Sequence, residues 1–177
     1  MPQASRLFTA TSWVVRIAAI LCAVLTAILV LAAGALVLAL LGLFTIPVPA
    51  SVTGGHPVSL VLLAGIFVVM ASALVVALSA MILVLVGRII ESARIGDPFV
   101  LINATRLNTI GGLLLAIQVV GLVAAVIVAS FPKPISDHVD FGFDVSGSGL
   151  FVVLLMFVLA QIFRQGSVMR AELEGTV

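Results

Sequence analysis

Four long apolar runs alternate with shorter polar segments along the chain. The runs cover residues 17–44, 59–86, 110–130 and 146–163, and none of them contains a charged side chain. A helix of about 20 apolar residues crosses the roughly 30 Å hydrocarbon layer of a bilayer, whereas a signal-peptide core has only about 7–15 residues. The pattern therefore predicts an all-α membrane protein with four transmembrane helices, of which the last is the shortest.

Composition supports the same fold class. Hydrophobic residues make up 63% of the 177 residues and charged residues only 8%, whereas a soluble domain is about 25% charged. We expect one membrane domain over residues 1–177, in contact with the lipid bilayer. The net charge of +1 gives no indication of direct nucleic-acid binding. Cys22 is the single cysteine and lies in an apolar run, so we interpret it as a small core side chain.

The basic residues predict the orientation of the helices. Lys and Arg concentrate on the cytoplasmic side of a membrane protein. In a four-helix topology seven of the eight basic residues fall on one side, and Lys133 alone falls in the outer loops. We therefore place both termini, the segment 87–109 and the tail 164–177 in the cytoplasm. The seven are Arg6, Arg16, Arg88, Arg94, Arg106, Arg164 and Arg170.

The outer loops, residues 45–58 and 131–145, contain a period of two that is typical of strands. Apolar residues alternate with others in both loops, and two prolines in the first loop favour an edge strand. We therefore expect a small extracytoplasmic β-ribbon on the helix ends. The alternating apolar positions are Ile46, Val48, Ala50 and Val52 in one loop, and Val139, Phe141, Phe143 and Val145 in the other.

Histidine and carboxylate side chains in the outer loops form a candidate metal-ligand set. Their spacing matches no specific zinc or calcium motif, and we favour a solvated acidic surface without assigning ligands. The chain also lacks a nucleophile elbow, a P-loop, a dinucleotide fingerprint and paired cysteines, so we expect no enzyme and no cofactor. The candidate ligands are His56, Asp137, His138, Asp140 and Asp144.

The segment 87–109 is the most polar part of the chain between apolar runs and predicts a helical hairpin. Arg88, Glu91 and Arg94 recur at three-residue steps, so their charges can pair along one face of the first helix. Gly96, Asp97 and Pro98 suit the C-cap, the N-cap and the first helical position in turn. On the second helix Phe99, Asn103, Arg106 and Ile110 follow at helical spacing, with Leu107 and Thr105 on flanking faces. The hairpin is either a capped turn whose arginines reach lipid headgroups or a docking surface.

Small residues predict where the helices pack on one another. Gly65, Ser72 and Ser79 recur every seven residues in the second run. In the third run Gly121, Ala125 and Ala129 recur every four residues, with Gln118 near the same face. Small side chains let two helix backbones approach closely in lipid, and an amide hydrogen-bonds across the seam. Gln118 could instead line a substrate path.

Two stretches resemble the bacterial membrane family called domain of unknown function twenty-nine seventy-five. Residues 95–111 read I-G-D-P-F-V-x-x-N-A-x-R-L-x-x-I-G, and residues 162–177 read I-F-R-x-G-x-x-M-R-x-E-L-E-G-T-V. The resemblance implies four membrane spans and a location in the bacterial inner membrane. By gene association alone, it also implies a short helix-turn-helix regulator as a partner. Many members carry an aromatic residue where this chain has Gly112.

Our leading hypothesis is a non-enzymatic membrane protein whose cytoplasmic hairpin and tail dock or sequester a regulatory partner. One alternative is a small transporter or channel component that forms a homo-oligomer along the Gly121, Ala125 and Ala129 seam. Another is a structural or lipid-binding protein. The residues assigned to docking are Arg94, Gly96, Asp97, Pro98, Phe99, Asn103, Arg106, Leu107, Phe163, Arg164, Gly166 and Arg170.

Overall fold

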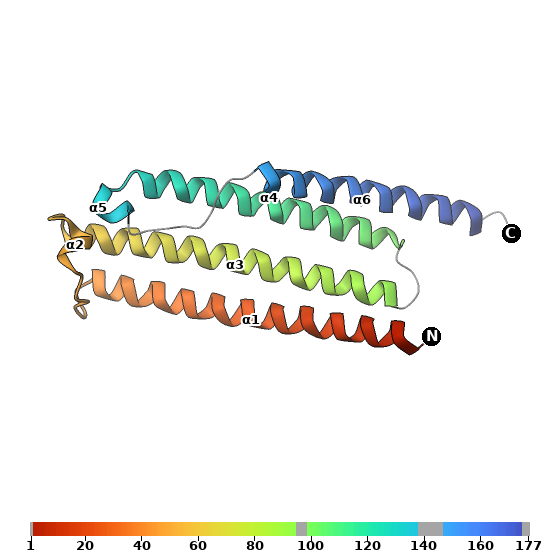
Figure 1. Cartoon of the computed structure of the whole chain (residues 1–177), viewed down its shortest axis with the longest axis horizontal. Helices are drawn as coiled ribbons and strands as arrows, with labels where there is room; N and C mark the ends of the chain where they lie inside the picture. Colours follow the sequence, from red (N-terminus) through yellow and green to blue (C-terminus); the bar gives the residue numbers. More distant parts are fainter. Residues whose placement is uncertain (1, 95–98, 138–146, 175–177) are drawn as a thin grey trace. The chain divides into compact units, whose positions relative to one another are not determined.

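The computed structural model describes residues 2–94, 99–137 and 147–174. These residues form six helices and no strand. Figure 1 shows the four long helices, coloured by their position in the sequence. They are α1 (Pro2–Leu40), α3 (Val58–Arg94), α4 (Leu101–Ala129) and α6 (Gly147–Glu174), and the short helices are α2 (Ala50–Thr53) and α5 (Lys133–Ser136).

The four long helices are long and apolar enough to cross a membrane. They contain 39, 37, 29 and 28 residues in chain order. At about 1.5 Å per residue even the shortest is roughly 42 Å long, which exceeds the roughly 30 Å hydrocarbon layer by two turns or more. The prediction of an all-α, multi-pass membrane protein is therefore confirmed. The surplus turns carry charged residues at the end of α3, the start of α4 and the end of α6.

Two compact units divide the described chain. Unit 1 comprises Met1–Cys22, Leu78–Ala116 and Ser146–Val177, and unit 2 comprises Ala23–Ala77 and Ile117–Val145. Unit 1 therefore holds the first half of α1, the end of α3, the first half of α4 and all of α6. It contains the whole of the segment 87–109 and the tail, so the candidate site lies within this unit.

Small side chains dominate the buried positions of the long helices. The most deeply buried apolar residues include Ala64 and Ala73 on α3 and Ala124 on α4, each with 3% or less of its surface exposed. Large apolar side chains such as Leu31 and Phe151 are instead exposed. This distribution suits lipid, where apolar side chains can face outward and small residues allow helix contact.

The expected β-ribbon is wrong in its first half. Residues 46–49 have no regular structure, and Ala50–Thr53 forms the helix α2 instead of a strand. Gly54 ends α2 with a φ of +53° and a hydrogen bond from its amide to the carbonyl of Ala50. A local helical turn satisfies these backbone groups without a partner strand. The prolines also make this segment a poor partner for another strand, because proline has no amide hydrogen to donate. Val139, Phe141, Phe143 and Val145 lie outside the described residues.

Helix α5 occupies the described part of the other outer loop, and it packs on α2 within unit 2. Pro132 precedes the helix, and the amide of Asp137 donates to the carbonyl of Lys133 at its end. Ile135 is buried with 1% of its surface exposed. A Cβ on Gly54 would lie 2.6 Å from Cβ of Pro134, so this glycine allows the two short helices to meet. Helix on helix thus replaces the expected ribbon in the described loops.

Candidate functional site

Asn103 is the most deeply buried polar residue of the described chain, with none of its surface exposed. It lies in the first turn of α4. Its amide nitrogen donates a 2.6 Å hydrogen bond to Oγ of Ser92 on α3, and Ser92 in turn donates to the carbonyl of Ile89 at 2.8 Å. A buried amide that lacks partners is costly, because it loses its hydration without compensation. These bonds therefore fasten the start of α4 to the end of α3.

Arg106 completes this polar cluster from the next turn of α4. Its Nη1 donates to Oδ1 of Asn103 at 2.9 Å and to the backbone carbonyl of Arg88 at 3.0 Å. Both ends of the Asn103 amide are thus hydrogen-bonded, and no buried side-chain nitrogen or oxygen in the described residues lacks a partner. We call Arg88, Ser92, Asn103 and Arg106 the polar clasp.

An ion pair lies at the end of α3, beside the polar clasp. Nη2 of Arg94 lies 2.6 Å from Oε1 of Glu91, and Nε of Arg94 donates to Oε2 at 3.1 Å. The two side chains keep 50% and 37% of their surfaces exposed, so solvent screens the pair and its contribution to stability is small. Arg88, the third charge on the predicted face, supplies its carbonyl to the clasp. The residues of the predicted cap, Gly96, Asp97 and Pro98, lie outside the described residues.

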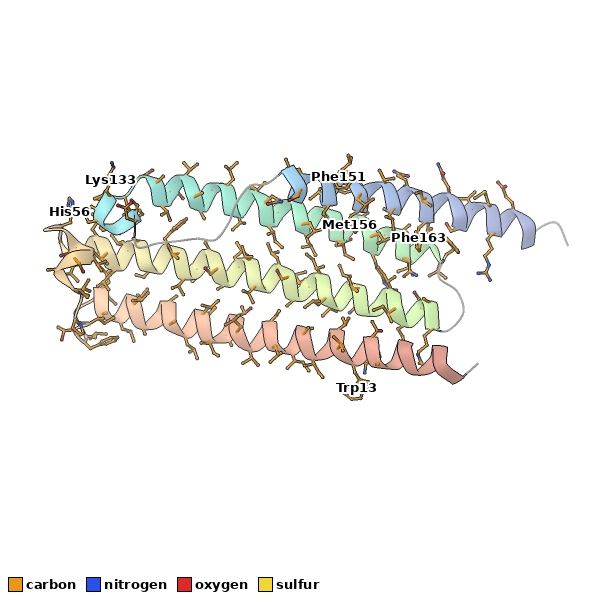
Figure 2. All side chains as sticks on the ribbon, in the orientation of Figure 1. Trp13, His56, Lys133, Phe151, Met156 and Phe163 are labelled. Carbon is orange, nitrogen blue, oxygen red and sulfur yellow. The ribbon has the colours of Figure 1, made fainter. Side chains whose placement is uncertain are left out.

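One contact between two phenylalanine rings and two contacts between a ring and a glycine join α6 to α4 and to Phe99 just before it. The rings of Phe99 and Phe163 lie 5.2 Å apart between centroids, tilted by 36°. Phe163 of α6 is labelled in Figure 2. A Cβ on Gly166 of α6 would lie 3.0 Å from Cδ1 of Phe99. A Cβ on Gly111 of α4 would lie 3.1 Å from the ring of Phe157 on α6. Each helix thus contributes a glycine against which a ring from the other segment packs.

The docking candidates divide into residues that pack internally and residues that are exposed. Phe99 lies before α4, which begins at Leu101, and keeps 43% of its surface exposed despite its ring contact. Arg94, Arg164 and Arg170 are also exposed. Asn103 and Leu107 are buried, and Arg106, Phe163 and Gly166 are half-buried. Only the exposed set can meet a partner without rearrangement of the helices.

The helix-packing candidates also differ in exposure. On α4, Gly121 is buried, Gln118 and Ala125 are half-buried, and Ala129 is exposed, whereas Ala124 and Val128 are buried next to them. On α3, Gly65, Ser72 and Ser79 are half-buried. A Cβ on Gly65 would lie 3.5 Å from Leu36 of α1, an ordinary contact, and the Ser72 hydroxyl donates to the carbonyl of Val68. Ala129 is therefore the exposed position of the α4 stripe.

Two grooves of different chemistry open on unit 1. The first groove has a volume of about 220 Å³ and lies between α4 and α6. The second groove, about 250 Å³, lies between α1 and α3 and contains two arginines together with the Glu91 carboxylate. The first is lined by Leu101, Ala104, Thr105, Asn108, Ala160, Gln161 and Arg164, and the second by Val15, Arg16, Ala19, Leu83, Val84, Gly87, Arg88 and Glu91.

The sequence interpretation missed several residues that build this site. Ser92 lies outside the quoted motifs and becomes important only through its contact with Asn103. Phe157 and Ala160 lie in an apolar run where nothing in the sequence marks them. Asn108 gave a usable signal, because it lies seven residues after Leu101 and so shares a helix face with it. Thr105, four residues after Leu101, was predicted only on a flanking face of the helix.

Within the described residues, no group of three or more His, Cys, Asp or Glu side chains could hold a metal ion. His56 and Asp137 are exposed in the described loops. His138, Asp140 and Asp144, the other members of the candidate set, lie outside the described residues.

Replacing Asn103 with alanine should lower the free energy of unfolding by about 1–3 kcal/mol, because the change removes two hydrogen bonds and opens space in a buried site. Thermal unfolding of the purified protein in detergent measures the effect. Asn108→Ala is the matched control, since Asn108 is exposed on the same helix. Equal stability of the two variants would show that the polar clasp does not hold α3 to α4.

Adjacent glycines on α4 give a second test. Gly112 is exposed, and a Cβ at this position would meet no neighbouring atom within 4 Å, so Gly112→Ala should raise stability by up to about 1 kcal/mol through helix propensity. Gly111→Ala should be about 1–2 kcal/mol less stable than Gly112→Ala, because its Cβ presses on the Phe157 ring. The same unfolding measurement applies. Equal gains from both changes would contradict close packing at Gly111.

Comparison with known proteins identifies the family. Searches of curated proteins and of solved structures each returned no match. The family model described as "Protein of unknown function (DUF2975)" matches residues 73–177, which is more than half of the chain. The match includes the polar clasp, the phenylalanine and glycine contacts, and the first groove. The predicted resemblance is thus confirmed, and the chain belongs to this family of membrane proteins of unknown function.

Proposed function

We propose that this chain is a non-enzymatic protein of the bacterial inner membrane that docks or sequesters a cytoplasmic regulatory partner. The docking surface is formed by the start of α4 and the last turns of α6. The observation that carries this proposal is the exposure of apolar side chains on helix ends that extend beyond the hydrocarbon layer. We call these residues the docking surface; they are Phe99, Ile102, Val168 and Met169.

The charge pattern supports a position outside the hydrocarbon layer for this surface. Arg106 is the last charged residue before an uncharged stretch of α4 that is itself long enough to cross the bilayer. Ile102 precedes Arg106 by one turn, and Val168 and Met169 follow Arg164 by one turn. Apolar side chains in these positions have neither lipid tails nor a protein core to cover them. A partner with an apolar face would bury them.

The exposed arginines favour an acidic rim on that partner. Arg164 and Arg170 are exposed on α6, and Arg94 is exposed at the end of α3. Complementary charge around an apolar centre steers association and selects the partner. The family resemblance implies a short helix-turn-helix regulator by gene association, and such a protein is the partner we propose. Internal packing of Asn103 and Arg106 supports a role for them in holding the surface in place.

Orientation is the first part of the proposal to test. In a background with Cys22→Ala, we expect Ser51→Cys in the first outer loop to react with a membrane-impermeant maleimide in intact cells. Gln165→Cys at the end of α6 should react only after the membrane is permeabilised. Both native side chains are exposed in the structure, so burial does not limit either reaction. The opposite labelling pattern would place the docking surface outside the cell and rule out a cytoplasmic partner.

Docking itself is tested by a photocrosslinking amino acid in place of Ile102 or Met169, in cells. We expect one protein adduct at both positions, identified by mass spectrometry as a helix-turn-helix regulator. The matched control is Val123, an apolar residue within the uncharged stretch of α4 that is also exposed, with 48% of its surface free. Ile102→Glu should reduce the adduct formed at Met169 at least tenfold, because it introduces a like charge toward an acidic rim. Adducts with lipid alone, or the same protein adduct at Val123, would overturn the proposal.

A further inference from the structure

The first groove, between α4 and α6, has a polar rim and an apolar floor. Its floor is formed by Ala104 and Ala160, which have 5% and 6% of their surfaces exposed. Two alanines that face one another leave a hollow where longer side chains would meet. The volume of about 220 Å³ is several times the roughly 30 Å³ that one water molecule occupies. The hollow is therefore large enough for a ligand group rather than for one water.

Three side chains that can donate hydrogen bonds line this hollow. The side chains of Asn108, Gln161 and Arg164 line the groove, and none of them forms a hydrogen bond or ion pair within the described residues. Thr105 adds a hydroxyl, whose hydrogen bond to the carbonyl of Leu101 is long at 3.5 Å. No carboxylate lines the groove. The rim thus offers one positive charge and several donors, and it offers no negative charge.

We propose that this groove binds the phosphate group of an anionic phospholipid. A guanidinium supplies a planar pair of N–H donors that matches phosphate oxygens, and hydrogen bonds to a charged acceptor are the strong ones. The amides of Asn108 and Gln161 donate to the remaining phosphate oxygens. The second groove is the weaker candidate for an anion, because the Glu91 carboxylate lines it.

The position of the groove along the two helices favours a lipid over a soluble phosphate. Arg164 is the first charged residue after the apolar run of α6, and Arg106 of α4 is the last charged residue before the uncharged stretch of that helix. The groove residues of α4 and α6 therefore lie at the boundary where headgroups meet hydrocarbon. Ile162, which precedes Arg164 on the apolar side of α6, is exposed, with 55% of its surface free, and can contact the acyl chains. Basic pockets between membrane helices are a known form of headgroup site.

Lipid binding to the full-length protein, purified in detergent, tests the proposal. Titration with phosphatidylglycerol, followed by native mass spectrometry, gives the dissociation constant. Arg164→Gln should weaken binding about tenfold, as expected for loss of one charge-assisted hydrogen bond. Ala160→Leu should weaken binding to a similar extent by filling the hollow. Arg94→Gln is the matched control, since it removes one exposed arginine outside the groove, and it should change binding less than twofold.

Two results would overturn the proposal. Equal affinity of the wild type and Arg164→Gln would show that the groove does not bind the lipid phosphate; Arg164 is exposed, so this variant does not depend on repacking of the core. Equal weakening by Arg94→Gln would indicate nonspecific attraction between charges. Competition experiments with inorganic phosphate and with glycerol phosphate distinguish a lipid from a soluble phosphate as the ligand. Displacement of the lipid by either compound at millimolar concentration would assign the groove to a soluble phosphate instead.

Discussion

The buried amide of Asn103 is the constraint on which the rest of unit 1 depends. In the low-dielectric interior of a helix packing such an amide needs all its partners, and it finds them only when Ser92 and Arg106 lie on either side. This requirement fixes both the rotation of α4 and its height relative to the end of α3. Apolar contacts between two uncharged helices would tolerate several rotations of nearly equal energy. The polar clasp selects one of them.

Once α4 is fixed by the polar clasp, its other faces acquire their roles. Gly111 is presented to the ring of Phe157, and Phe99 reaches the surface at Gly166. Ala104 faces Ala160 across the first groove. Close approach at two glycines brings α4 and α6 together, whereas two alanines between them keep a hollow open. A small change of residue size thus separates a tight contact from a ligand site.

The two interpretations of the polar segment 87–109 describe different faces of the same structure. Asn103 and Arg106 hydrogen-bond within the polar clasp, whereas the predicted cap of the turn lies outside the described residues. The exposed residues of the docking surface and the groove beside it have no role in that turn. In our proposals the lipid phosphate lies at the membrane boundary, and the protein partner binds the helix ends beyond it. Arg164 lies between the two and contributes charge to both.

Periodicity and charge in the sequence were enough to determine the four long helices, because a membrane span needs only a long apolar stretch without charge. The family motifs likewise identified Asn103, Arg106, Phe99 and Gly166 as special positions. Their roles were decided by tertiary structure, since burial and hydrogen bonding depend on partners such as Ser92 and Phe157 that are distant in sequence or unmarked in apolar runs. The same reason explains the lost strand at residues 50–53, where a two-residue period had no partner strand to pair with and a local helical turn formed instead. A groove is a property of two facing helices, so no single segment of the sequence could predict it.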